Sequence, residues 1–143
     1  MKKYYTYPKH DAIKNYFPLP NEIFDLGLTS GEIALYAFLM RCENRNTFQC
    51  YPSYRTIGSA IKVSPNTVRK YVSGLCEKEL IVAEPTKIIT KAGIKRNGNL
   101  LYTIRPIEEA IRYNVEAQIR HNEKILQEQL MMEKVKKVFS YTG

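Results

Sequence analysis

The sequence contains no tryptophan and only three cysteines and two histidines in its 143 residues. Cys42, Cys50 and Cys76 are odd in number and irregularly spaced, so they fit neither a disulfide framework nor a zinc site. We therefore expect reduced thiols that are buried or half-buried. The sequence also has no glycine-rich phosphate loop, no metal-ligand cluster and no nucleophile paired with a base. These absences argue against an enzyme and predict no cofactor and no metal.

Long apolar runs are missing as well. No stretch approaches the length that crosses a bilayer, and residues 1–5 (MKKYY) lack the apolar segment of a signal peptide. We therefore expect a cytoplasmic protein with no membrane partner. Apolar residues nevertheless make up 44% of the chain, which is enough for the core of one compact domain with an appended element.

Positive charge is abundant and unevenly distributed. The net charge is +8. Residues 53–105 hold ten lysines and arginines against three acids, a net charge of +7, whereas residues 1–52 carry +1 and residues 106–143 carry zero. A basic excess confined to one third of the chain is typical of a surface that neutralises phosphates.

The first half of the chain predicts an extended arm followed by a buried helix. Three prolines break residues 1–20, so this segment is expected to be an extended N-terminal arm. Thr29 and Glu32 have the spacing of a capping box, and the apolar residues that follow predict a helix over residues 30–43. A short strand is expected near residues 48–51.

Two closely spaced helices come next. Ser53 caps the first, and Ser64 caps the second, whose first position is Pro65. The second helix is expected over residues 65–78. At 100° per residue its inner face carries Val68, Tyr71, Val72 and Leu75, its outer face carries Asn66, Lys70 and Ser73, and Arg69 lies on the flank. Gly74 inside this helix has no explanation in the sequence.

The pattern then changes to strands. Residues 80–83 and 87–90 are β-branched and predict strand with a bend near Pro85, and residues 100–104 predict a returning strand. Lys91, Lys95 and Arg96 are expected beside Asn97 and Gly98 at the hairpin tip. Residues 106–143 predict a C-terminal helix, with Asn114 or residues 120–124 as candidate breaks. The expected fold is mainly α with a small β-hairpin: a winged helix-turn-helix over residues 21–105.

The paired helices carry a resemblance to a known family. The run from Thr56 to Val72, with its core Ser64-x-x-Thr67-Val68-Arg69, resembles the DNA-reading half of bacterial winged-helix regulators of the GntR type. It departs from them at Lys62 and Glu79, where glycine is usual, and at Pro65, where arginine is common. Residues 17–106 are similar, more broadly, to winged-helix proteins of plasmids and mobile elements, including N-terminal domains of replication initiators.

These observations predict a sequence-specific protein that binds double-stranded DNA, most simply as a transcriptional regulator and homodimer joined by the C-terminal helix. The second paired helix would enter the major groove, and the wing, about residues 87–99, would contact the backbone or minor groove. No small-molecule ligand is evident. The predicted DNA-binding residues are Tyr54, Arg55, Ser64, Asn66, Thr67, Arg69, Lys70, Ser73, Lys91, Lys95, Arg96 and Asn97.

Two alternatives remain open. A replication initiator or maintenance protein of a mobile element would use the same DNA contact for another purpose. A protein-interaction adapter would have an apolar or acidic outer face on the second helix. The observed face, with Asn66, Arg69, Lys70 and Ser73, fits that poorly.

Overall fold

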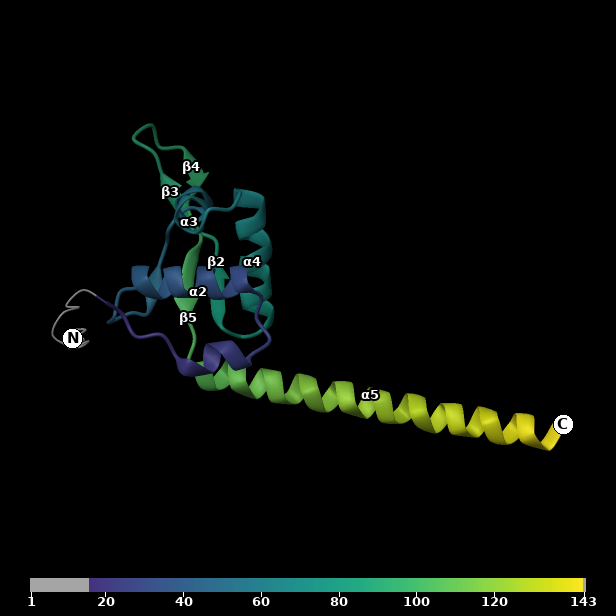
Figure 1. Ribbon diagram of the computed structural model, residues 1–143. Coiled ribbons are helices and arrows are strands. Elements are labelled where there is room, and N and C mark those ends of the chain that lie inside the picture. The colour runs from purple at the N-terminus through teal and green to yellow at the C-terminus, as the bar shows by residue number, and fades with distance from the viewer. Residues whose placement is uncertain (1–15, 143) are drawn as a thin grey trace, which may run out of the picture.

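The computed structural model describes residues 16–142 (Figure 1). Most of the predicted arm, residues 1–15, lies outside the described residues, and residues 16–20 have no regular secondary structure. The elements in chain order are η1 (Asn21–Asp25), α2 (Ser30–Cys42), β1 (Gln49–Cys50), α3 (Tyr54–Ile61), α4 (Pro65–Glu77), β2 (Ile81–Glu84), β3 (Lys87–Ile89), β4 (Lys95–Asn97), β5 (Leu101–Ile104) and α5 (Ile107–Thr142).

Three helices and a small sheet enclose the core. Helices α2, α3 and α4 pack against one another, and α4 and α2 also contact the sheet. The core is built mainly from aliphatic side chains of these elements, with Tyr36 and Tyr102 as its largest members; the other residues at 1% exposure or less are Ile23, Leu35, Leu39, Ile57, Val68, Leu75, Leu80, Ile81 and Ala110. Burying this set supplies the main driving force for folding.

A partly buried ion pair joins α2 to the end of α4. The predicted capping box is present, because Thr29 Oγ1 accepts from the Glu32 amide and Glu32 Oε1 accepts from the Thr29 amide. The same Oε1 lies 2.9 Å from Lys78 Nζ. A Cβ atom on Gly74 would lie 2.0 Å from Glu32 Oε2. Gly74 is therefore required for the carboxylate to reach its place, which explains a glycine that the sequence left unexplained.

The predicted fold class, mainly α with a small β-hairpin, is confirmed, but the strands divide into two antiparallel sheets. Strand β5 pairs with both β1 and β2, in the order β1-β5-β2, and belongs to the core. Beyond Pro85 the chain continues into a separate two-stranded ribbon of β3 and β4. The alternating burial of β5 reflects its central position, whereas every residue of β3 and β4 is exposed. We call residues 85–99 the wing.

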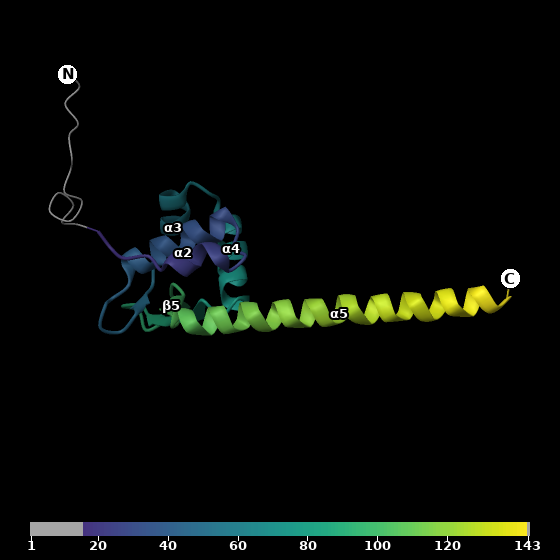
Figure 2. The same cartoon turned by 60° about the horizontal axis from the view of Figure 1, so that its bottom comes forward.

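Helix α5 is unbroken and leaves the domain. Ala110 is buried, and Ile107 and Ile111 pack on the core, but the helix then runs away from the other elements (Figures 1 and 2). The candidate breaks at Asn114 and at residues 120–124 were both wrong, because α5 is continuous through them. The Asn114 side-chain amide donates to the Asp25 carbonyl at 3.4 Å, just where α5 leaves the domain. The expected packing on the domain is confined to the first turns. Across residues 16–142 no helix combines the length and the apolar character that crossing a bilayer requires.

Candidate nucleic-acid interface

The turn between α3 and α4 brings the two helices together tightly. Lys62 adopts the left-handed conformation (φ 62°), and the Val63 amide donates to the Gly58 carbonyl at 3.0 Å. A Cβ atom on Gly58 would lie 2.5 Å from the Val63 carbonyl oxygen, so the close approach needs glycine there. This turn has the helix–turn–helix arrangement that the sequence predicted.

Serine caps start both helices. Ser53 Oγ accepts from the Thr56 amide at 3.0 Å, and Ser64 Oγ accepts from the Thr67 amide at 3.3 Å. The hydroxyls of Ser64 and Thr67 also share a hydrogen bond of 3.0 Å. Ser64 and Thr67, both predicted DNA-binding residues, therefore have a structural role of their own at the start of α4, which Pro65 occupies as expected.

The outer face of α4 is polar and basic. Asn66, Arg69, Lys70 and Ser73 are exposed, whereas Val68, Val72 and Leu75 are buried on the opposite side. The predicted division of the helix into an inner and an outer face is confirmed. Side chains of these types donate to and accept from base edges and phosphates.

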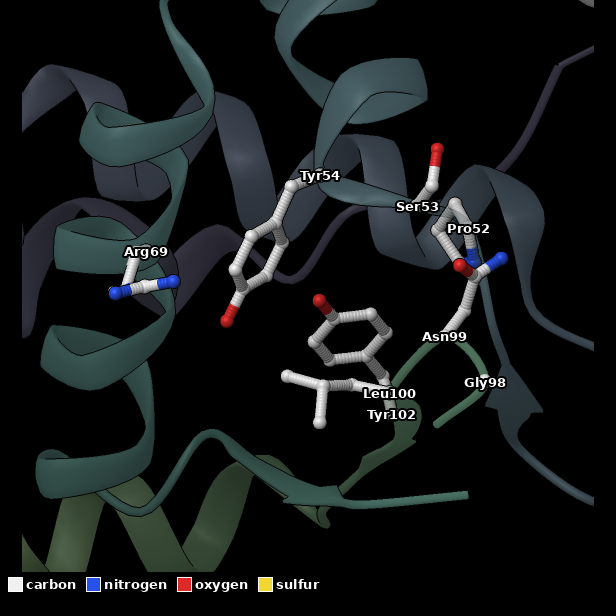
Figure 3. Close-up of a pocket in the computed structure, with 8 residues that line it drawn as sticks. All are labelled: Pro52, Ser53, Tyr54, Arg69, Gly98, Asn99, Leu100 and Tyr102. Carbon is white, nitrogen blue, oxygen red and sulfur yellow. The ribbon is translucent and has the colours of Figure 1, made fainter. Parts of the chain in front are cut away.

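A cavity of about 340 Å³ separates α4 from the base of the wing. Tyr54 from α3 and Arg69 from α4 line it on one side, and Asn99 and Leu100 from the wing base line it on the other (Figure 3). The Arg69 guanidinium carbon lies 6.0 Å from the centre of the Tyr54 ring, within cation–π range. The structure thus brings together Tyr54 and Arg69, while Arg55 is exposed on the neighbouring position of α3.

The basic residues of the wing occupy different positions from those expected. Lys91 lies in the turn, but Lys95, Arg96 and Asn97 form β4 and pair with Ile89, Ile88 and Lys87. The tip is the turn at Gly93, whose φ of +77° suits glycine, and the Gly93 amide donates to the Thr90 carbonyl. Asn97 and Gly98 lie at the base, where the Gly98 amide donates to the Thr86 carbonyl. The prediction of a tip at Asn97 and Gly98 was therefore wrong.

Sequence reasoning missed several residues of this surface. Ile88, Ile89 and Ile94 are at least 53% exposed on the wing. The β-branched residues Ile88 and Ile89 were predicted as strand, which says nothing of their burial, and both are exposed in the described part of the chain. Tyr102 and Asn99 also border the cavity between α4 and the wing. Their role depends on contacts between distant segments, such as the 3.2 Å hydrogen bond from Asn99 Nδ2 to the Tyr51 carbonyl.

The cysteines do not form a site. All three are free; Cys50 is buried and Cys76 half-buried as expected, but Cys42 is exposed. Burial raises the pKa of the Cys50 thiol to about 12, helped by the neighbouring Cys42 and Glu43, so this thiol stays protonated at neutral pH. Within residues 16–142 no three side chains of the metal-binding types gather around a common point.

The paired helices also match a family of known domains. Residues 26–81 match the model of a helix-turn-helix domain. This helix-turn-helix domain begins at the end of η1 and ends at the first residue of β2, so it includes α2, α3 and α4. The wing and α5 lie outside it. No curated protein matches the chain.

Several solved structures are similar in arrangement. A possible transcriptional regulator from Methanosarcina mazei is 19% identical, with a TM-score of 0.46; the match covers 72% of this chain and 80% of the regulator's chain. Lactococcus lactis ZitR in complex with DNA is 23% identical, with a TM-score of 0.38 over 85% and 71%. Bordetella bronchiseptica BpsR is 22% identical, with a TM-score of 0.39 over 74% and 64%. The helix-turn-helix assignment stands on the family match and on the elements themselves.

Proposed function

We propose that this protein binds double-stranded DNA with sequence specificity and acts as a transcriptional regulator. The observation that carries the proposal is the exposed outer face of α4, where Asn66, Lys70 and Ser73 project from a helix-turn-helix domain. In this arrangement α4 enters the major groove with its N-terminal part nearest the bases.

The wing supports the same docking. It presents Lys91, Lys95 and Arg96 as exposed side chains on a ribbon whose base borders the same cavity as α3 and α4, within the segment that holds nearly all the net positive charge. These residues would contact backbone phosphates, and a narrow ribbon of this kind also suits the minor groove. The exposed Ile88 and Ile89 add apolar contact area on the ribbon.

A second copy of the chain is the proposed partner of α5. Between residues 115 and 135 its projecting part exposes eight large apolar side chains: Val115, Ile119, Ile125, Leu126, Leu130, Met131, Met132 and Val135. Residues 107–123 carry four acids and two bases, whereas residues 124–142 carry four bases and two acids. Antiparallel pairing of two α5 helices would cover apolar surface and match these opposite charges. A dimer of this kind would read two half-sites.

Selection from random duplexes tests the proposed function. The full-length chain should enrich a short motif, present as two related half-sites if the dimer forms. Enrichment of no motif would contradict sequence-specific binding. The position of the enriched motif, at promoters or at an origin, would separate a regulator from a replication initiator. No observation favours the replication initiator, which uses the same DNA contact.

A further inference from the structure

The cavity between α3, α4 and the wing base has features of a binding site. Its lining comes from the start of α3, from Arg69 of α4, and from residues 98–100 at the wing base, with Tyr102 behind them (Figure 3). None of the eight residues that line it is acidic. Arg69 supplies a positive charge to the lining, and Ser53, Tyr54 and Asn99 supply polar side chains. The cavity is therefore suited to an anion.

A buried hydroxyl points into this space. Tyr102 is 0% exposed, and its hydroxyl has no hydrogen-bond partner among residues 16–142. Figure 3 shows the hydroxyls of Tyr102 and Tyr54 directed toward the same region. Burial raises the pKa of Tyr102, so its hydroxyl keeps its proton and remains a donor at neutral pH. A buried donor without a partner costs free energy, and a ligand oxygen would relieve that cost.

Arg69 lines the cavity and lies on the flank of the outer face of α4, not at its centre. At 100° per residue it lies about 60° from Asn66 around the α4 axis, on the side where the Tyr54 ring holds its guanidinium. Asn66, Lys70 and Ser73 project together from the middle of the outer face. Arg69 thus differs from its neighbours in direction and in having an aromatic support.

From these observations we infer that the cavity binds one phosphate of the DNA backbone, and that Arg69 contacts this phosphate and not a base edge. The inference rests on the proposed function. In the proposed docking, α3, α4 and the wing all approach the duplex. With α4 in the major groove and the wing at the neighbouring groove, the DNA backbone that separates the two grooves passes next to the cavity. The guanidinium would bind two phosphate oxygens, and the tyrosine hydroxyls would donate to one of them.

This assignment leaves base reading to Asn66, Lys70 and Ser73. It also makes Tyr102, a buried residue of β5, a phosphate donor. Both statements can be tested on the full-length chain with the duplex obtained by selection.

The test combines Arg69→Gln and Tyr102→Phe with a matched control. Lys70→Gln removes the same charge from the adjacent residue. We expect Arg69→Gln to weaken binding to the selected duplex and to its single-base variants by the same factor, about tenfold or more. The log–log salt dependence should become shallower by about 0.9. Tyr102→Phe should weaken binding roughly two- to tenfold without lowering the melting temperature, since it removes an unpaired hydroxyl.

Double variants give the sharpest readout. If Arg69 and Tyr102 hold the same phosphate, their effects on affinity should be less than additive, whereas Lys70→Gln and Tyr102→Phe should be additive. A changed base preference in Arg69→Gln, or additive effects of Arg69→Gln and Tyr102→Phe, would overturn the inference while leaving DNA binding intact. Failure of the wild-type chain to bind any duplex would instead overturn the proposed function.

A free anion is the remaining possibility for the same chemistry. Inorganic phosphate at matched ionic strength would then raise the melting temperature of the wild type but not of Arg69→Gln. If phosphate raised the melting temperature of the wild type only, and Arg69→Gln bound DNA as tightly as the wild type, the cavity would bind a free anion. The inference would then be wrong.

Discussion

Gly74 lies inside α4 at the point where the Glu32 carboxylate meets the helix. In an open helix interior, glycine to alanine stabilises by about 1 kcal/mol. Here the new Cβ would collide with a carboxylate held by Lys78 and by the Thr29 amide. We therefore expect Gly74→Ala to lower the free energy of unfolding by about 1–3 kcal/mol, measured by urea denaturation.

The control for this prediction removes the colliding group. In a Glu32→Ala background, Gly74→Ala should recover its ordinary stabilising effect. If Gly74→Ala were equally destabilising in both backgrounds, the proposed collision would not be its cause.

Glu32 also predicts how stability depends on pH. Burial alone raises the pKa of its carboxyl, but the hydrogen bond from the Thr29 amide and the ion pair with Lys78 outweigh that effect, so the net pKa is lowered. A lowered pKa stabilises the fold above the unfolded value of about 4.3, and this contribution is lost as the pH falls through the folded value. As the pH is lowered from about 5 to about 3, the free energy of unfolding should fall less for Glu32→Gln than for the wild type. An identical pH dependence would contradict this account.

Residue patterns in the sequence predicted the local features of the fold. The capping box at Thr29, the serine caps and the two faces of α4 depend on neighbours in the chain, and all are present. Gly74 could not be explained in this way, because its partner Glu32 is distant in sequence. Lys62 and Glu79 both have positive φ, a conformation that local sequence signals do not reveal for such residues.

At the scale of elements, the wing should contribute affinity without sequence preference. Lys95→Gln combined with Arg96→Gln should weaken all duplexes by the same factor and make the log–log salt slope shallower by about 1.8, because two phosphate contacts are lost. Titrations of the selected duplex and its base variants would measure both. Arg41→Gln combined with Arg45→Gln is the matched control, since it removes equal charge from exposed residues at the end of α2 and in the loop after it, outside the proposed interface.

The control pair should leave affinity and slope nearly unchanged. A shift of base preference in the wing variant would show instead that the wing reads sequence.

The arrangement of this ribbon was only partly predictable. Its residues were recognised as strand and turn, but the register that places Asn97 opposite Lys87 depends on the turn at Gly93.

At the scale of the whole molecule, α5 sets the proposed assembly. A chain ending at residue 117 keeps Ala110 and Ile111, which pack on the core, and loses the exposed apolar residues beyond. We expect it to melt at a temperature close to that of the full chain at low protein concentration, and to sediment as a monomer. The full-length chain should sediment as a dimer. A monomeric full-length chain, or a dimeric truncated one, would contradict pairing through α5.

The sequence indicated a C-terminal helix but not its direction. Helix propensity and the lack of proline and glycine between Ile107 and Phe139 predicted a C-terminal helix. Whether such a helix folds back or projects depends on how much apolar surface the domain leaves for it. Here only the first turns find such surface, which local patterning does not reveal.

Sequence-specific DNA binding is the central claim, and comparison of two duplexes tests it most directly. The affinity of the full-length chain for the selected duplex and for a shuffled duplex of equal length and composition should be measured over a range of salt concentrations. The account predicts that both affinities fall with salt and that the selected duplex binds at least about 10³-fold more tightly at physiological salt. Equal affinities for the two duplexes, or binding that does not respond to salt, would contradict it.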